Sequence, residues 1–205
     1  SYSNIAKPDK PGIANLYDSN IFKRIQLLKA NVDFLIVIAH SGIELFQYPL
    51  PRDQKIYRRL IEYGADAVIG SHSHCIQAME LYNEKYIYYG IGDLIFDHFD
   101  ERVWPKFWTS AAHPQKFSIK ADPLLPKTSL LIELTLNDDI YVNHIPVTTM
   151  DSSGPYILEG FELNQWEEKF NEICYNLHQC DSTTLKREEI ESKLLRDLNK
   201  RSSAC

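Results

Sequence analysis

The chain has 205 residues, a formal net charge of −6, and a composition of 44% hydrophobic and 24% charged residues. These values are typical of a globular domain and argue against disorder for most of the chain. The negative charge argues against broad electrostatic binding to nucleic acid, because proteins that bind in that way present a basic face. No apolar run approaches the roughly 20 residues needed to span a bilayer, and no secretory signal is visible.

Helices and strands alternate in the first third of the chain. Apolar spacing predicts a helix over residues 19–30, and the continuous apolar run 34–39 predicts a strand buried on both faces, as in a parallel sheet. A second helix is predicted over residues 51–63, ending at Gly64, which can adopt the left-handed conformation of a helix cap. The short apolar strand 67–70 follows.

Three histidines follow the ends of these two strands. His40 ends the first strand, and His72 and His74 come directly after the second. Because the carboxyl ends of parallel strands lie along one edge of an open sheet, we expect the three imidazoles to meet there. Two side chains two residues apart in an extended segment also point to the same side. The pattern favours a metal site, although loop histidines that are merely solvated or hydrogen-bonded remain the alternative.

The second half of the chain has a different pattern. Two hairpins are predicted, over 76–96 with a turn at 83–85 and over 129–147 with a turn at 137–139. Between them, residues 98–128 are rich in Pro, Trp and Phe and show no clear period, as in a long functional or mobile loop. From about residue 164 the pattern predicts two polar amphipathic helices.

An ordered set of motifs over residues 11–98 resembles the bacterial CapA family. The set consists of H-x-G-x-E at 40–44, G-x-H-x-H at 70–74, and Y-x-x-G-[ND]-x-x-F-D ending at Asp97. The CapA family is associated with poly-γ-glutamate capsule synthesis and belongs to the calcineurin-like metallophosphoesterase superfamily. The ordered set is far more specific than any one of its motifs.

The resemblance implies an α/β fold, a metallophosphoesterase-like β-sandwich flanked by helices, with a metal site at the sheet edge. It implies a partial domain over 1–150 that lacks the amino-terminal half, followed by a helical extension over 151–205. His40 would bind one divalent metal (Mn, Zn or Fe), and His72 and His74 would bind one metal each in a dinuclear centre. The implied activity is hydrolysis of a phosphoester or of a substrate related to the capsule polymer, at the cell envelope.

The chain departs from the superfamily pattern in its metal ligands. It contains no D-x-H, G-D-x-x-D or N-H-[DE] motif. Two cations a few Å apart need anionic bridging ligands, whereas three histidines can hold one ion. We therefore interpret the chain as the carboxyl-terminal portion of a CapA-like phosphoesterase, completed by a missing amino-terminal half or another chain, with a homo-oligomer as one form. A noncatalytic binding or scaffold module with the same fold and a mononuclear three-histidine hydrolase are the alternatives.

Several further residues could line the site or could have only a structural role. Glu44 either orients His40 or is a solvated loop acid, and Asp93 either lines the site or belongs to a turn. Cys75 is expected to be a small apolar residue rather than a ligand. A structural role is predicted for Asp66 and Glu80. The remaining histidines, His98, His113, His144 and His178, are expected to be surface or hydrogen-bonded residues.

Overall fold

The computed structural model describes residues 5–7, 9–44, 46–94, 128–148, 154–178, 187–189, 191–192 and 196. The predicted loop 98–128 lies outside the described residues except for Thr128, as do Asp97, His98 and His113. The described part of the chain is a mixed α/β structure with two sheets, so the expected α/β class is confirmed. No helix of this part is long and apolar enough to cross a membrane.

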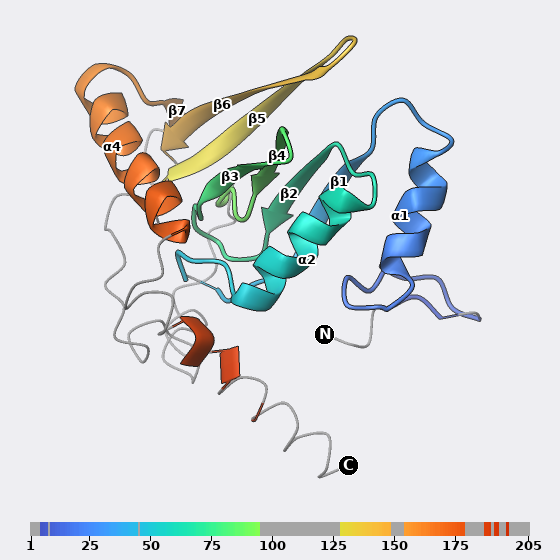
Figure 1. Cartoon of the computed structure of the whole chain (residues 1–205). Helices are drawn as coiled ribbons and strands as arrows, with labels where there is room; N and C mark the ends of the chain where they lie inside the picture. Colours follow the sequence, from blue (N-terminus) through green and yellow to red (C-terminus); the bar gives the residue numbers. More distant parts are fainter. Residues whose placement is uncertain are drawn as a thin grey trace.

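The first sheet has four strands; helix α2 (Pro51–Glu62) packs on it, and helix α1 (Ile21–Lys29) packs against α2 (Figure 1). The strands are β1 (Ile36–His40), β2 (Ala67–Ser71), β3 (Met79–Tyr82) and β4 (Lys85–Tyr88). The strand order is β1-β2-β4-β3; β1, β2 and β4 are parallel, and β3 is antiparallel to β4. The helices and strands predicted for this part of the sequence are therefore confirmed, with the boundaries of α1, β1, α2 and β2 within two residues of the prediction.

Helix α2 begins and ends where its sequence predicts. Pro51 occupies the first turn, where a missing N–H group costs nothing. At the other end Gly64 has a φ of +115°, and its N–H group donates to the carbonyl oxygen of Ile61 at 3.0 Å. The N–H group of Ala65 donates to the carbonyl oxygen of Leu60, also at 3.0 Å. These two bonds form a Schellman motif, which confirms Gly64 as the helix stop.

Both predicted hairpins form. Asn83 and Glu84 have positive φ angles of 48° and 60°, as a tight turn between β3 and β4 requires. The second hairpin consists of β5 (Thr128–Leu136) and β6 (Ile140–Thr148), and β7 (Tyr156–Ile157) adds a third antiparallel strand. The first of the two predicted carboxyl-terminal helices is α4 (Gly160–Leu177). Residues 187–189 and 191–192 are also helical.

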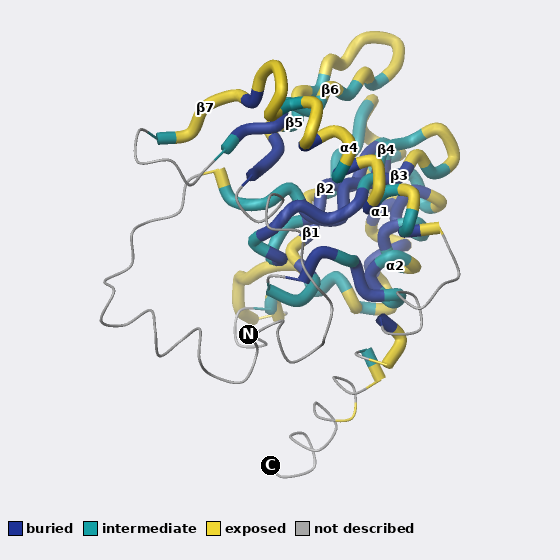
Figure 2. Tube along the Cα trace, turned by 90° about the vertical axis from the view of Figure 1, so that its left-hand side faces the viewer, coloured by how far each residue is buried: buried dark blue, intermediate teal, exposed yellow. Residues whose placement is uncertain are grey.

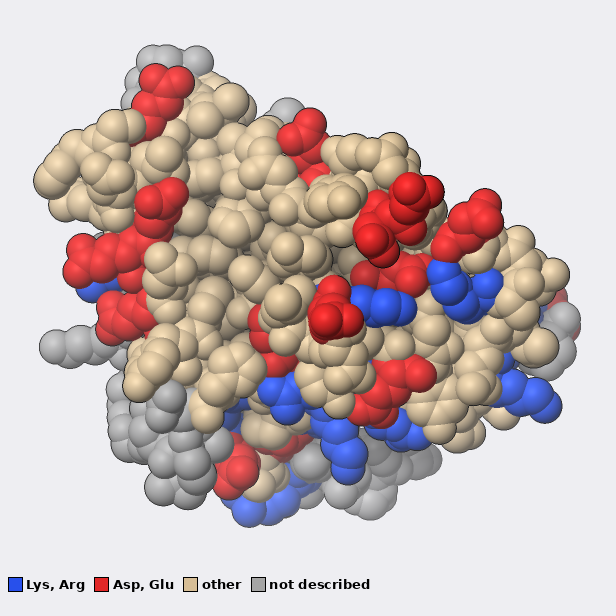
Figure 3. Space-filling model, turned by 45° about the horizontal axis from the view of Figure 1, so that its top comes forward, with Lys and Arg blue, Asp and Glu red and all other residues tan. Residues whose placement is uncertain are grey.

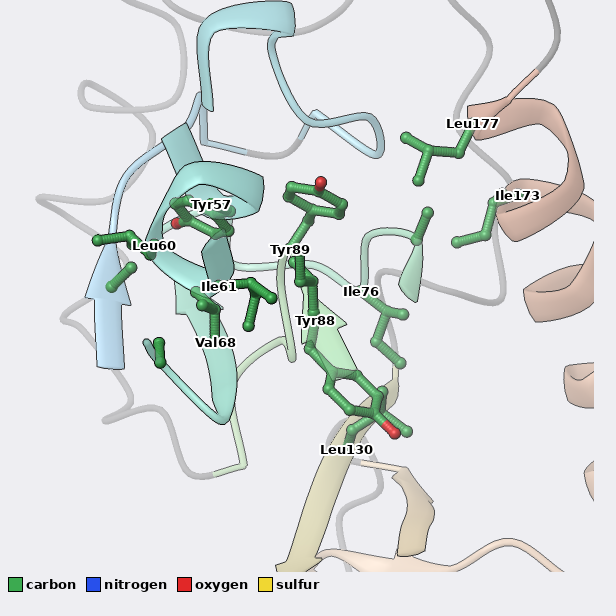
Figure 4. Packing of buried hydrophobic residues seen from close by; sticks show 14 of the residues in the cluster. Tyr57, Leu60, Ile61, Val68, Ile76, Tyr88, Tyr89, Leu130, Ile173 and Leu177 are labelled. Atoms are coloured by element: carbon green, nitrogen blue, oxygen red, sulfur yellow. The ribbon is translucent and has the colours of Figure 1, made fainter. Parts of the chain in front are cut away.

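One hydrophobic cluster joins these layers. Ile61 of α2 lies over Val68 of β2, while Tyr88 of β4 extends toward Leu130 of β5 (Figure 4). Helix α4 adds four buried side chains to the same cluster: Trp166, Phe170, Ile173 and Leu177. Strand β2 is the most deeply buried strand, whereas the tip of the β5–β6 hairpin is exposed (Figure 2). Helix α4, in the predicted extension 151–205, therefore shares a hydrophobic core with the predicted domain 1–150. The domain boundary at residue 150 stays a prediction.

The surface carries both signs of charge. On the face shown in Figure 3, acidic and basic side chains lie side by side. The Asp66 carboxylate makes two ion pairs, with oxygens 2.8 Å from Lys29 Nζ and 3.0 Å from Lys85 Nζ. Asp66 also accepts a hydrogen bond from the N–H group of Leu35, just before β1. These contacts agree with the structural role predicted for Asp66.

The prediction that the strand 34–39 is buried on both faces is wrong for its outer part. The Ile38 side chain is 73% exposed, although Ala39 beside it is buried. The reason is position: β1 is the edge strand of the sheet, and it pairs with β2 alone among the described strands. A continuous apolar run indicates a strand in a parallel sheet, but it does not say which strand lies at the edge.

An ion pair with a buried carboxylate connects α2 to β3, the edge strand opposite β1. The Glu80 side chain is 1% exposed and accepts hydrogen bonds from Arg58 Nε at 2.8 Å and Nη2 at 2.7 Å. The hydroxyl group of Tyr89 donates to the same carboxylate at 2.6 Å. This bidentate arrangement satisfies a charge that would be costly to bury alone. It also agrees with the structural role predicted for Glu80.

We predict that Arg58→Met lowers the free energy of unfolding by about 1–3 kcal/mol, because it removes the two hydrogen bonds that Arg58 donates to the buried Glu80 carboxylate. Urea denaturation followed by circular dichroism measures the change. The matched control is Arg24→Met, which removes an exposed guanidinium 3.6 Å from Asp18 and should cost less than about 1 kcal/mol. Equal losses in the two variants would contradict a stabilising role for the buried pair.

We also predict that the chain self-associates through β1. This edge carries no Pro or Lys that would block strand pairing, whereas the opposite edge is covered, since Met79 N–H donates to Cys174 Sγ of α4 at 3.2 Å. Sedimentation velocity should show a concentration-dependent dimer that Ile38→Lys dissociates. Leu81→Lys, at an exposed apolar position on the covered edge, should leave it intact. A dimer that is insensitive to Ile38→Lys, or a monomer at every concentration, would contradict the prediction.

Candidate metal centre

Parallel pairing brings the ends of β1 and β2 together. In the register of the two strands, His40 stands opposite Ser71. The Ser71 hydroxyl donates to the carbonyl oxygen of Ala39 at 3.2 Å, and Nδ1 of His40 lies 3.1 Å from the same hydroxyl oxygen. Because the hydroxyl proton is already engaged, His40 must donate from Nδ1, which places the acceptor lone pair on Nε2 when His72 donates to it.

His72 continues this chain of hydrogen bonds. Its Nδ1 lies 3.0 Å from Nε2 of His40, and the two ring centroids are 4.6 Å apart. Since His40 accepts at Nε2, His72 donates from Nδ1 and carries its lone pair on Nε2. Burial, and next the nearby His40, lower the pKa of His72 below its usual value. His72 is therefore neutral at pH 7, which is the form that binds metals.

His74 is oriented by a carboxylate. Its Nδ1 lies 2.8 Å from Oδ2 and 3.0 Å from Oδ1 of Asp93, in the segment that follows β4. A hydrogen bond from Nδ1 to a carboxylate fixes the tautomer with the lone pair on Nε2. Of the two roles considered for Asp93, the structure therefore supports the one that lines the site.

The backbone that carries the two histidines is not extended, so the expectation drawn from alternation in an extended segment is wrong. His72 has a φ of 95° and His74 a φ of 53°, both in a region that residues with side chains rarely adopt. Their rings nevertheless converge, with centroids 6.2 Å apart. Gly70 permits this turn to lie close to β4, since a Cβ atom there would stand 2.1 Å from the carbonyl oxygen of Tyr89.

Glu44 completes a set of possible ligands. One carboxylate oxygen of Glu44 and one ring nitrogen each of His72 and His74 all lie within 4.8 Å of one another. All three residues are half-buried. Glu44 comes from the loop between β1 and α2 (residues 41–50), so the set combines two loops at the same sheet edge. Sequence reasoning gave Glu44 only a supporting or solvated role, although the H-x-x-x-E spacing placed it near the site.

His40 lies beside this set rather than within it. Among the described residues, the group of possible ligands close enough to share one ion consists of Glu44, His72 and His74. Both ring nitrogens of His40 make hydrogen bonds, to Ser71 and to His72. In this arrangement His40 supports His72. That His40 binds a metal directly stays a prediction.

The other candidates lie away from the site or outside the described residues. Cys75 is fully buried, and burial raises the pKa of its thiol to about 12, which agrees with the predicted apolar role. His144 is hydrogen-bonded to the Tyr88 hydroxyl at 3.0 Å, as expected of a histidine without a metal role. The His178 side chain is half-exposed, with Nε2 3.8 Å from Glu80. Cys180 and Cys205 are outside the described residues.

Comparison with known proteins identifies the segment that carries the site. Residues 1–98 match the family described as bacterial capsule synthesis protein PGA_cap. This segment, which we call the CapA-like segment, is similar to that capsule synthesis family. The CapA-like segment is 30% identical over 97 residues to the capsule biosynthesis protein CapA of Bacillus anthracis, and 30% identical over 92 residues to the PGA biosynthesis protein CapA of Bacillus subtilis.

The matched region covers only part of each protein. Each Bacillus alignment takes in 45% of this chain and 24% of the relative. A probable polyglutamine synthesis accessory protein of Mycobacterium tuberculosis is 31% identical over 100 residues, which is 45% of this chain and 26% of that protein. The chain thus spans about a quarter of the length of the curated relatives it matches. All six residues of the candidate centre, His40, Glu44, Ser71, His72, His74 and Asp93, lie in the CapA-like segment.

The donor atoms of the CapA-like segment suit one divalent ion. Two neutral imidazoles and one carboxylate form a set that Mn, Zn and Fe all accept. The Asp93–His74 hydrogen bond supplies the carboxylate support that ligating histidines usually have. Among the described residues, these three ligands would leave coordination positions open, as reactive metal sites require.

We predict that Asp93→Ala weakens binding of Zn²⁺ by about 10-fold to 100-fold, because His74 loses the partner that fixes its ring. Isothermal titration calorimetry on chelator-treated protein measures the affinity. Glu133→Ala, which removes a carboxylate from strand β5, is the matched control and should leave the affinity unchanged. An affinity that is unchanged in Asp93→Ala would show that Asp93 does not support the ligand set.

Proposed function

We propose that this chain provides part of a metal-dependent phosphoesterase-like domain linked to capsule or poly-γ-glutamate synthesis at the cell envelope. The observation that carries the proposal is the convergence of Glu44, His72 and His74, whose donor atoms lie within 4.8 Å of one another. The printed descriptions of the relatives, which name capsule and PGA biosynthesis, support the process. The H-x-G-x-E and G-x-H-x-H motifs support the metallophosphoesterase-like fold.

Each residue has a definite task in this proposal. Glu44, His72 and His74 hold the ion, His40 orients His72 through its Nε2 atom, and Asp93 orients His74. When bound, a divalent ion supplies positive charge for phosphoryl oxygens and activates water. The side chains of the chain itself bind and orient, and we assign none of them as a nucleophile.

A dinuclear centre needs further ligands. Two neutral imidazoles and one carboxylate offer a single negative charge, which offsets little of the repulsion between two divalent ions. We propose that additional carboxylates come from residues outside the described part of the chain or from another chain. The outer edge of β1, which pairs with no other strand among the described residues, is suited to receive such a partner, because a strand added parallel to β1 would end beside His40.

The proposal is tested by metal content together with hydrolysis. Chelator-treated protein is dialysed against Mn²⁺, Zn²⁺ or Fe²⁺, and bound metal is counted by elemental mass spectrometry. We predict close to one ion per chain, lost in the double variant His72→Ala, His74→Ala. The variant His178→Ala, in a half-exposed histidine away from the site, is the control and should retain the ion. Hydrolysis of bis-p-nitrophenyl phosphate should follow the metal content.

The possible outcomes separate the candidate functions. Metal binding without hydrolysis would overturn the phosphoesterase proposal for this chain and favour the noncatalytic binding module. Two ions per chain would show that carboxylates beyond Glu44 contribute. If no metal binds to the chain, alone or mixed with another CapA-like chain, the proposal of a metal centre would be overturned.

A further inference from the structure

The loop between β1 and α2 is fixed at its start by a buried carboxylate. Asp53, in the first turn of α2, is 2% exposed. Its Oδ1 atom accepts hydrogen bonds from the Tyr17 hydroxyl at 2.5 Å and from the Ser41 hydroxyl at 2.9 Å. The two hydroxyl groups also contact each other. Ser41 directly follows His40 and stands three residues before Glu44, so this contact restrains the backbone between them.

A cation–π contact with Arg52 also holds the Tyr17 ring in place. The Arg52 guanidinium lies 4.9 Å from the centroid of the Tyr17 ring. Burial, and next the Asp53 carboxylate, raise the pKa of Tyr17 to about 12. The hydroxyl group is therefore a proton donor throughout the neutral range. Tyr17 comes from the segment before α1, so three separate parts of the chain meet at Ser41.

A second contact fixes the same loop further on. Gln77 is 1% exposed, and its Nε2 atom donates to the carbonyl oxygen of Phe46 at 2.7 Å. Gln77 lies three residues after His74, so it ties the loop that carries Glu44 to the segment that carries the histidines. Phe46 itself is buried with Leu50 in a small apolar cluster.

The Asp53 carboxylate is only partly compensated: Arg52 Nε lies 3.8 Å from Oδ1, beyond hydrogen-bond distance. Its second oxygen, Oδ2, is buried and has no hydrogen-bond partner among the described residues. An unsatisfied buried acceptor costs about 1–3 kcal/mol, and more when it is charged. The contacts of the other oxygen, Oδ1, suggest why a carboxylate stands here despite this cost. Oδ1 accepts hydrogen bonds from two hydroxyl groups that belong to distant segments of the chain.

We propose that Asp53, acting through Ser41 and Tyr17, and Gln77, acting through Phe46, are positioning residues for the metal centre. They hold the β1–α2 loop so that the Glu44 carboxylate stays within ligand distance of His72 and His74. Neither residue touches the ion. The inference rests on the proposed function, because it assigns the purpose of the two contacts to that centre.

The first test is the Zn²⁺ affinity of three variants, measured by calorimetry on chelator-treated protein. Asp53→Ala removes the acceptor and should weaken binding about 10-fold, the lower end of the effect of residues that support ligands. Asp53→Asn keeps an oxygen acceptor of the same shape and should restore the affinity to within about threefold of the wild type. Gln77→Met keeps the length of the side chain without its donor and should weaken binding about as much as Asp53→Ala.

The matched control is Asp66→Ala. Asp66 binds Lys29, Lys85 and the N–H group of Leu35 at the opposite end of β1, so its loss should lower the melting temperature without changing the Zn²⁺ affinity. A structural role alone would make Asp53→Ala behave like this control. Equal affinity in Asp53→Ala and the wild type would therefore overturn the inference.

A second measurement does not depend on metal binding. Amide hydrogen exchange of the metal-free protein should be faster over residues 41–44 in Asp53→Ala than in the wild type, and unchanged there in Asp66→Ala. If the wild type binds no metal, the proposed function fails, and exchange alone decides whether Asp53 fixes the loop. If the wild type binds metal but exchange over 41–44 is the same in Asp53→Ala, the positioning role fails and the metal centre stands.

Discussion

The parallel pairing of β1 with β2 is the constraint on which the candidate centre depends. It sets His40 opposite Ser71, and the loops that leave these two residues carry Glu44, His72 and His74. A shift of one residue in register would turn one set of side chains to the other face of the sheet. The register is specified by the buried faces of β2, whose residues Ala67–Gly70 are all buried. Packing far from the site thus decides the geometry at the site.

The site is built on backbone that carries strain. His72 and His74 both have positive φ, which costs of order 1–3 kcal/mol for each residue unless the surroundings compensate. Several contacts hold this conformation: the Asp93–His74 hydrogen bond, the His40–His72 hydrogen bond, and Ser73, whose hydroxyl donates to the carbonyl oxygen of Cys75 at 2.8 Å. Strained backbone that several contacts hold in place is typical of functional segments. It directs side chains to positions that an ordinary turn would not reach.

Much of this arrangement could be predicted from local signals, and the remainder depends on neighbours. Gly64 and the Asn83–Glu84 turn are set by nearby residues, so the sequence predicted them well. The exposure of Ile38 depends on which strand lies at the edge, and a pattern in one segment carries no such information. The convergence of the histidines was predicted from strand ends although the assumed extended backbone was wrong. The position of Glu44 close to His72 and His74 was not predicted, because it depends on the path of the ten-residue loop 41–50.

The number and charge of the ligands bear on what an ion would do here. A closed structural zinc site uses four protein ligands, whereas Glu44, His72 and His74 supply three. An ion held by this set keeps a net positive charge, since one carboxylate offsets only half the charge of a divalent cation. Open positions and residual charge together favour an anionic ligand such as a phosphoryl group. Within the described part of the chain, the three ligands thus leave coordination positions open, whereas the fold itself is stabilised by the buried hydrophobic core.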